Sequence, residues 1–324
     1  MRSVAIYNAK GGVGKSAVTV FLAEFLAAEL RARVLVVDLD PRQSSSAALL
    51  GDARLFAGLQ QKASLDQLLR RRLQGPLDLA ETRRYLLTRP AASGKGDHRW
   101  LGAMTVLAAD REAWHDLSED LIRLRRGDSH PYDELLTDAL APLSSEFDVA
   151  LIDFPAHDRG PLVRAGLRAS GWWLLPLLPD RVSLRDLDSS RQLLRAVSVG
   201  AATRIRPLGT LPTLCPPRRG GAYLTAKATL ARLAEQRLIP KLFPVEAEIP
   251  FGSEAKNGLD DVLLDRCRTL SHRLGARDGA LHQAVSRLGR EVVARLKTAA
   301  ISATLASGPS INEAAAALWA TESS

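Results

Sequence analysis

The sequence contains little cysteine and no long apolar run. Its two cysteines, Cys215 and Cys267, are far apart and have no partner in a metal-binding or redox spacing, so we read both as small core residues. No window approaches the roughly 18 consecutive apolar residues of a membrane-spanning helix. The N-terminus also lacks the basic segment and long apolar segment of a signal peptide. The sequence therefore predicts a cytoplasmic protein.

The composition is otherwise close to that of folded soluble chains. With 46% hydrophobic and 25% charged residues, it disfavours a disordered chain, a collagen and a coiled-coil rod. The length of 324 residues fits one large α/β domain with extensions or two smaller domains.

Positive charge is concentrated in one part of the chain. The net charge is +8, and residues 181–241 contain twelve Lys and Arg residues against three Asp and Glu residues. The rest of the chain is therefore nearly neutral. Such a block favours a polyanionic partner, either nucleic acid or an acidic membrane surface.

Short apolar segments alternate with helical patterns along the chain. After the first segment, apolar residues spaced by three and four mark one helix face: Val18, Phe21, Leu22, Phe25 and Leu26. The predicted strands cover residues 4–7, 34–37, 104–109, 149–153, 172–178 and 207–212. This order predicts an α/β fold with a doubly wound, mostly parallel sheet and helices on both faces, whose ligands bind at the carboxyl ends of the strands.

Two regions depart from this alternation. Residues 60–100 are mixed and charged, and we expect an insertion over the sheet that ends in a loop at 89–98. After about residue 275 the strand pattern stops, and one apolar stripe of a long helix follows: Leu281, Val285, Leu288, Val292, Leu296 and Ala299. We therefore expect a main domain over residues 1–275 and a C-terminal helical extension over 276–324.

The strongest motif is KGGVGKS at residues 10–16, between the first strand and the first helix. Gly14, Lys15 and Ser16 form the core of a phosphate-binding loop, and Ala9-Lys10 stands where the usual motif has its first glycine. Glycines let backbone N–H groups surround phosphate oxygens, Lys15 supplies charge to the β and γ phosphates, and Ser16 can ligate Mg²⁺. The expected nucleotide contacts are Gly11, Gly12, Val13, Gly14, Lys15, Ser16 and Ala17.

Three aspartates follow neighbouring strands. Asp153 ends the strand VALID, where an acidic residue can hold the shell of a Mg²⁺ ion. Asp38 and Asp40 end the second strand, and carboxylates one residue apart on a strand point the same way. Read in isolation, this pair could instead cap the helix that follows. Together with the phosphate loop, the three aspartates predict a nucleotide and magnesium site.

These motifs resemble the ParA/MinD group of deviant Walker ATPases, a group of P-loop NTPases, and its ParA branch most. The resemblance rests on residues 10–16, 34–41, 148–155 and 174–194, and it covers roughly residues 1–265. It implies ATP and Mg²⁺ as cofactors and a homodimer closed around ATP.

The resemblance also implies a role for each motif residue. Lys10 would reach the partner's phosphates in trans, while Lys15 and Ser16 contact phosphate and Mg²⁺ within one chain. Asp40 would orient the attacking water. Asp38 and Asp153 would organise Mg²⁺ through its waters, and slow hydrolysis would time the separation of the dimer.

The chain departs from the family pattern at two places. It has Asp40-Pro41-Arg42-Gln43 where the family often has Asp-Pro-Gln, and Asp153-Phe154-Pro155-Ala156 where it often has Asp-x-Pro-Pro. The carboxylates are kept, so the changes bear on the geometry of the water and the switch loop. For adenine, we expect contacts from Pro212 and from residues 248–251, which include Pro250.

The first functional hypothesis is an ATPase that partitions DNA or positions a cargo. It would bind DNA without sequence preference in its ATP state, lie on the nucleoid and respond to a stimulating partner, either ParB-like or a cargo adaptor. Phosphate contacts scale with the number of Lys and Arg residues engaged. The expected DNA contacts, all from the basic block, are Arg191, Arg195, Arg218, Arg219 and Lys227.

Two alternatives stay open. A MinD-like regulator would bind a membrane, but residues 314–324 contain no Lys or Arg. The stripe at 281–299 could lie on lipid or pack on its own domain. A metabolic relative would need bridging cysteines or a small-molecule pocket, neither of which the sequence reveals. The histidines, including His157, and the pair Trp172-Trp173 are read as packing and surface residues.

Overall fold

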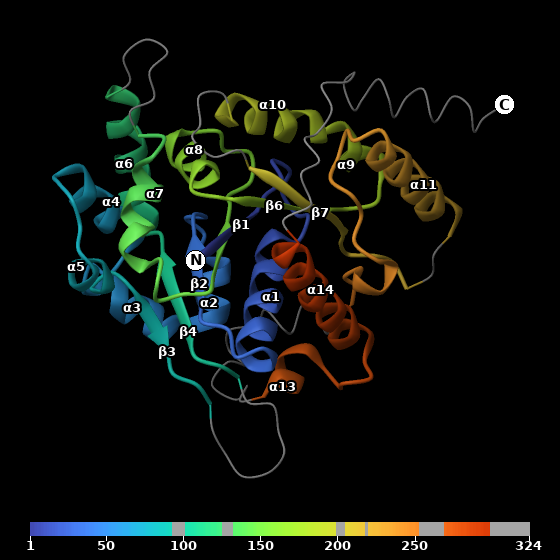
Figure 1. Ribbon diagram of the computed structural model, residues 1–324, viewed down its shortest axis with the longest axis horizontal. Coiled ribbons are helices and arrows are strands. Elements are labelled where there is room, and N and C mark those ends of the chain that lie inside the picture. Colours follow the sequence, from blue (N-terminus) through green and yellow to red (C-terminus); the bar gives the residue numbers. More distant parts are fainter. Residues whose placement is uncertain (93–100, 125–131, 199–204, 218–219, 253–268, 299–324) are drawn as a thin grey trace.

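The chain folds around one seven-stranded sheet (Figure 1). The computed structural model describes residues 1–92, 101–124, 132–198, 205–217, 220–252 and 269–298. The strand order is β3-β4-β2-β5-β1-β6-β7, and all strands run parallel except β3. The strands are β1 (Arg2–Ile6), β2 (Val34–Asp38), β3 (Leu87–Arg89), β4 (Met104–Ala108), β5 (Val149–Asp153), β6 (Trp172–Leu177) and β7 (Arg206–Pro212). The doubly wound, mostly parallel sheet expected from the sequence is confirmed.

The six predicted strands are all present, with ends that differ from the prediction by at most two residues, and one strand was missed. β3 has only three residues, and it pairs antiparallel with β4 at the edge of the sheet. An edge strand this short carries no long apolar run, so pairing with its neighbour, rather than its own pattern, makes it a strand.

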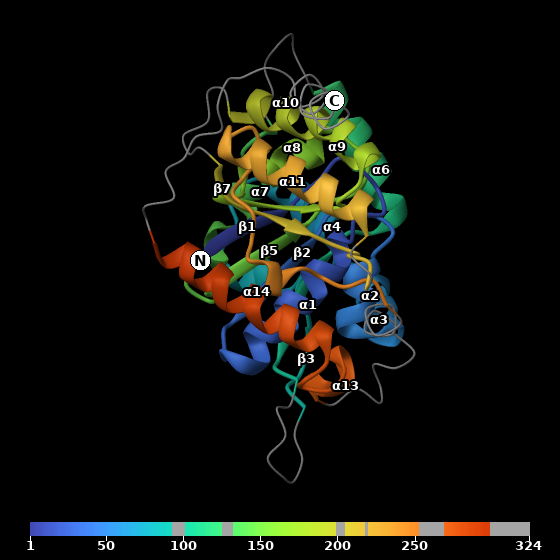
Figure 2. The ribbon, with the colours of Figure 1, turned by 90° about the vertical axis from the view of Figure 1, so that its right-hand side faces the viewer.

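One face of the sheet is covered by the first helix and by the last ones (Figure 2). Five buried side chains on α1 form the face predicted from their spacing, and all belong to this core. The outer side of α1 is buried as well, because α14 packs along it. The elements on this face are α1 (Lys15–Glu29), α2 (Ser44–Leu50), α3 (Asp52–Gln60), α13 (Leu270–Leu274), α14 (Ala280–Lys297) and the 3₁₀ turn η2 (Val245–Ala247).

The opposite face is covered by the helices from the middle of the chain, which form a second apolar core (Figure 2). These are α4 (Leu65–Leu73), α5 (Leu79–Arg83), α6 (Arg111–Arg123), α7 (Leu135–Leu140), the 3₁₀ turn η1 (Ala141–Leu143), α8 (Pro161–Arg168), α9 (Arg181–Arg185), α10 (Leu187–Ser198) and α11 (Gly221–Glu235). Residues 60–100, expected as an insertion, supply α4, α5 and the edge strand β3, and residues 93–100 lie outside the described part.

The stripe of the last described helix packs on its own chain. Leu281, Val285, Leu288 and Val292 are fully buried in the core shared with α1, and Leu296 is 7% exposed. This rules out the reading in which these side chains lie on lipid. Ala299 and the rest of the expected extension fall outside the described residues. Among the described residues, no helix is both long and apolar enough to cross a membrane.

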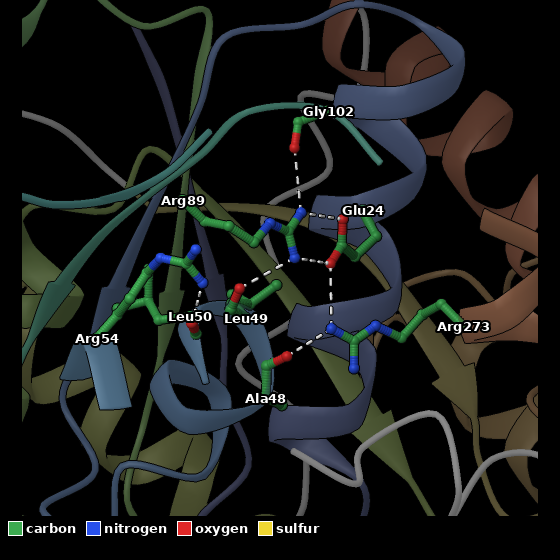
Figure 3. Close-up of polar contacts among 8 residues, drawn as sticks. All are labelled: Glu24, Ala48, Leu49, Leu50, Arg54, Arg89, Gly102 and Arg273. Atoms are coloured by element: carbon green, nitrogen blue, oxygen red, sulfur yellow. Dashed lines mark hydrogen bonds and ion pairs between the residues drawn. The ribbon is translucent and has the colours of Figure 1, made fainter. Parts of the chain in front are cut away.

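A buried ion cluster joins three distant segments on the face of the sheet that α1 covers (Figure 3). The Glu24 carboxylate on α1 accepts two hydrogen bonds from Arg89 of β3, at 2.7 and 2.8 Å, and one from Arg273 of α13, at 3.3 Å. The same guanidinium groups donate to the carbonyl oxygens of Leu49 and Ala48. The cluster therefore holds the C-terminal end of α2, the helix that follows the loop of Asp38 and Asp40.

Candidate nucleotide-binding site

Residues 10–17 form a loop from the end of β1 into the first turn of α1. Gly12 and Gly14 have φ angles of 72° and 80°, a left-handed backbone that favours glycine. Gly14 is the N-cap of α1 and provides no side-chain cap for the first-turn N–H groups. The loop thus presents backbone donors and the positive end of the helix dipole, an arrangement that suits phosphate.

The ammonium group of Lys15 lies inside this loop. Lys15 as a whole is 6% exposed, and its Nζ donates to the Lys10 carbonyl oxygen at 2.8 Å. Burial lowers the pKa of Lys15 to about 8, although the charges of Asp153 and Asp40 oppose this shift and Arg42 adds to it. Lys15 therefore remains mainly protonated at neutral pH, with little competing hydration for a phosphate to displace.

Asp38 and Asp153 lie in register on the neighbouring parallel strands β2 and β5, and both are fully buried. The Asp38 carboxylate accepts bonds from the Ser46 N–H and hydroxyl, at 3.0 and 2.6 Å, and from the Asp40 N–H at 3.0 Å. Burial raises the pKa of Asp38 despite these donors. Asp38 is thus firmly positioned at the carboxyl end of β2.

The Asp153 carboxylate is the feature that best fits a bound cation. Neither of its oxygens has a hydrogen-bond partner within the described residues. Burial, and then the charge of Asp38, raise the pKa of Asp153 to about 7, while the charge of Lys15 lowers it. No three His, Cys, Asp or Glu side chains of the described part cluster in a way that could hold a metal. Phosphate and water oxygens would therefore have to complete a Mg²⁺ shell beside Ser16.

Asp40 also lies at the carboxyl ends of the strands, but its carboxylate already forms an ion pair. Its carboxylate is bound by the Arg42 guanidinium, with Nη2 to Oδ2 at 2.8 Å and Nε to Oδ1 at 3.1 Å. The bond with Asp40 raises the pKa of Arg42. Arg42 was noted from the sequence only as a departure from the family pattern.

Lys10 folds back onto its own chain. Its Nζ donates to the Ser183 hydroxyl on α9 at 3.0 Å and lies 3.9 Å from the Asp186 carboxylate. Its side chain is 18% exposed, so it lies near the surface of the site. The single chain thus places Lys10 beside the phosphate loop but directs its ammonium group toward α9.

The segments expected at adenine lie side by side next to the phosphate loop. The Ile249 N–H, next to Pro250, donates to the Pro212 carbonyl oxygen at 3.1 Å, and the Thr213 hydroxyl donates to the Val13 carbonyl oxygen at 2.8 Å. A cavity of about 410 Å³ opens nearby, and residues from the ends of β6 and β7 and from α11 line it, including Leu178, Leu214 and Tyr223.

The expected DNA contacts are not equally available. Arg191 is 3% exposed, and its Nη1 lies 3.6 Å from the Asp188 carboxylate. Burial also lowers the pKa of Arg191. Its side chain is therefore not available to contact a DNA phosphate. Lys227 is paired with Glu248 at 2.5 Å. Arg195 is exposed on α10. Arg218 and Arg219 lie outside the described residues.

Three contacts around the phosphate loop were missed from the sequence. Thr213 supports Val13, as described above, and the Ser190 hydroxyl accepts a hydrogen bond from the Ala9 N–H at 2.9 Å. His157 was read as a packing or surface residue. Its backbone N–H donates to the Ala9 carbonyl oxygen, and its ring Nε2 lies 3.3 Å from the point where a Cβ on Gly11 would lie. Single serines, threonines and histidines carry no motif, so only their position in the fold reveals them.

The fold and this loop define the class of protein as a P-loop NTPase. A sequence profile described as an AAA domain matches residues 1–81. The chain is 28% identical to the chromosome partitioning protein ParA of Myxococcus xanthus over 68% of each chain. It is 26% identical to the chromosome-partitioning ATPase Soj of Thermus thermophilus, over 92% of this chain and 98% of that one.

Solved structures agree on the fold. The pNOB8 ParA bound to nonspecific DNA matches with a TM-score of 0.68 at 20% identity, covering 92% of this chain and 99% of that one. Cobyrinic acid a,c-diamide synthase of Mycobacterium smegmatis, with bound ADP and magnesium, matches with a TM-score of 0.63 at 23% identity, covering 92% and 96%. Motifs, sequence relatives and fold together confirm the resemblance of this chain to the P-loop ATPases of the ParA/MinD type.

Proposed function

We propose that this protein is an ATP-dependent dimerising ATPase of ParA type that binds DNA without sequence preference in its ATP state. It would partition DNA or position a cargo, and a partner protein would stimulate its hydrolysis. The observation that carries the proposal is the convergence of Lys15, Asp38, Asp40 and Asp153 beside one phosphate loop at the carboxyl edge of the sheet.

Each group at this edge has a distinct task. The loop N–H groups and Lys15 bind the phosphates, and the Ser16 hydroxyl ligates Mg²⁺. Asp153 and Asp38 would hold water molecules of a Mg²⁺ shell, which suits a carboxylate pair of which one member, Asp153, has no hydrogen-bond partner within the described residues. Mg²⁺ bound there would neutralise charge that develops on the phosphate oxygens during transfer.

Asp40 and Lys10 are assigned to the hydrolytic step. Asp40 accepts a hydrogen bond from the attacking water and directs it at the γ-phosphate. Lys10 acts in a dimer, in which it leaves Ser183 and contributes its charge to the partner's phosphates. To make this movement, Lys10 would have to give up its hydrogen bond to Ser183 and its 3.9 Å ion pair with the half-exposed Asp186.

DNA binding is supported by the basic block and by the relation to ParA proteins. Of the expected contacts, Arg195 and the pair Arg218 and Arg219 stay in the proposal, whereas Arg191 is withdrawn because it is buried. Lys227 would have to leave Glu248 to contact DNA. Other exposed cations of the block within the described residues are Arg181, Arg206, Arg232, Arg237 and Lys241.

The test is binding to a duplex of random sequence at fixed salt, with ATP and Mg²⁺, with ADP, and without nucleotide. We expect binding only with ATP. Equal binding in all three states would mean a constitutive basic surface and would contradict the nucleotide switch. Absence of binding, together with ATP-dependent pelleting on anionic liposomes, would favour the membrane alternative.

Two variants check the site itself. Lys15→Ala should lose ATP binding or hydrolysis, and normal turnover in this variant would overturn the site.

Asp40→Ala should keep ATP and accumulate as a dimer in size-exclusion chromatography, because the water loses its acceptor while the phosphate contacts stay. A monomer at saturating ATP would contradict that role.

A further inference from the structure

The loop between β2 and α2 contains an ion pair that phosphate binding does not require. Arg42 and Asp40 share three contacts below 3.2 Å: Nη2 to Oδ2 at 2.8 Å, Nε to Oδ1 at 3.1 Å, and the Arg42 N–H to Oδ1 at 3.0 Å. The Asp40 side chain is 3% exposed and that of Arg42 is 65% exposed. The guanidinium therefore covers a buried carboxylate from the solvent side.

These contacts occupy the acceptor sites that a water molecule would need. A carboxylate oxygen has about two lone-pair directions. Oδ1 already accepts the Arg42 N–H and Nε, and Oδ2 accepts Nη2 and, at 3.3 Å, a second share of Nε. Asp40 cannot accept a bond from an attacking water at full strength while this pair is closed.

Hydrogen bonds fix both the loop that carries the pair and the helix α2 that follows it. At its start, the Asp38 carboxylate binds the Asp40 and Ser46 N–H groups. At the far end of α2, Arg89 and Arg273 hold the Leu49 and Ala48 carbonyl oxygens (Figure 3). The exposed Arg42 side chain is the part free to rotate, so the pair can open without moving the backbone.

We propose that Arg42 is an inhibitory latch on Asp40, which keeps basal ATP hydrolysis slow until the guanidinium turns away. The latch rests on the proposed function, since it requires Asp40 to orient the water. It acts on the rate of the chemical step and leaves nucleotide binding unchanged. Arg42 is a regulatory positioning residue, because it acts through Asp40.

The test compares steady-state ATP hydrolysis by the full-length protein and by Arg42→Gln, without DNA or a partner protein. Removing one charge-assisted pair should raise kcat by roughly three- to tenfold. KM for ATP and Kd for ADP should change less than about twofold. A general loosening of the site would instead weaken nucleotide binding along with the change in kcat. Arg42→Lys, which keeps the charge but cannot form the two-pronged contact, should fall between the two.

Two controls locate the effect. Arg54→Gln removes another exposed arginine, on α3, whose Nη1 donates to the Leu50 carbonyl oxygen at 3.4 Å, and it should leave kcat unchanged. The double variant Arg42→Gln/Asp40→Ala should show no gain over Asp40→Ala. A gain that persists without Asp40 would overturn the latch.

The latch and the proposed function fail in different ways. If hydrolysis depends on Lys15 and Asp40 but Arg42→Gln is no faster than the unchanged protein, only the latch is overturned. If neither protein shows hydrolysis that depends on Lys15, the proposed function is overturned and the latch with it. Turnover that appears only in Arg42→Gln would support both.

Discussion

At the scale of single residues, Asp153 provides a test that does not depend on the proposed function. Its pKa of about 7 lies above the usual value for an aspartate, about 4, because of burial and the neighbouring Asp38. Between these values the folded protein holds a proton that the unfolded chain has released. The contribution of Asp153 to stability is therefore complete below pH 4 and is lost as the pH rises through about 7.

Asp153→Asn should remove this penalty. At pH 8 and without nucleotide, we expect the variant to be roughly 2 to 4 kcal/mol more stable than the unchanged protein, and the difference should disappear near pH 4. Urea denaturation at both pH values measures it. Asp116→Asn, on the exposed side of α6, controls for the amide substitution. A gain of the same size at pH 4 would mean that packing, and not the charge, is responsible.

At the scale of elements, the contact between α1 and α14 is unusually close. A Cβ atom on Gly289 of α14 would lie 2.2 Å from Cδ1 of Phe25 on α1. Phe25 is 1% exposed and belongs to the core, so it has no open space to enter. Gly289→Ala should therefore destabilise the protein by about 1 to 3 kcal/mol, because the two helices must separate or Phe25 must leave its rotamer.

The matched change is Gly220→Ala, where a Cβ would meet nothing within 4 Å. Its effect in thermal denaturation should stay within about 0.5 kcal/mol. Equal losses at the two positions would show that α14 does not pack tightly on α1.

The cluster of Glu24, Arg89 and Arg273 makes a second prediction for elements. Glu24→Gln leaves two buried guanidinium groups without their counter-charge, and the expected loss is about 3 to 5 kcal/mol of unfolding free energy. Glu119→Gln breaks an exposed pair with Arg123 and should cost less than about 1 kcal/mol. Guanidinium chloride denaturation compares the two, and a small loss at Glu24 would show that the cluster is solvated.

At the scale of the whole molecule, the basic block of the sequence does not form one surface. Arg181 follows β6 at the carboxyl ends of the parallel strands, where the phosphate loop lies. Arg206 begins β7 and therefore lies at the amino ends of the strands, on the opposite side of the sheet from the loop. Arg191 is buried and Lys227 is paired with Glu248. A count of charges along the chain therefore overstates what one DNA duplex can contact.

Arg195 tests the DNA surface directly. If it contacts a DNA phosphate, Arg195→Ala should weaken ATP-dependent binding about equally for all sequences and lower the salt dependence by about one unit. Arg123→Ala removes an exposed arginine from α6 and should leave the slope unchanged. An unchanged slope for Arg195→Ala would exclude this residue from the DNA contact.

The sequence alone predicted the fold class, six of the strands and the phosphate loop, because these depend on local patterns. Apolar runs with a fixed spacing define buried strands and one face of α1, and the glycines of the loop are required by its backbone angles. The three aspartates were predicted to converge because parallel strands end at one edge. All of these inferences need only the order of residues and the direction of the strands.

Tertiary structure decided what order along the chain cannot fix. It paired β3 with β4, covered the outer side of α1 with α14 and buried Arg191. It also divided the basic block between the amino and the carboxyl ends of the strands. It also set Arg42 against Asp40 and Lys10 against Ser183. These results depend on which side chains meet across the fold, and on which lose water when they meet, so they follow from packing between distant segments and not from local pattern.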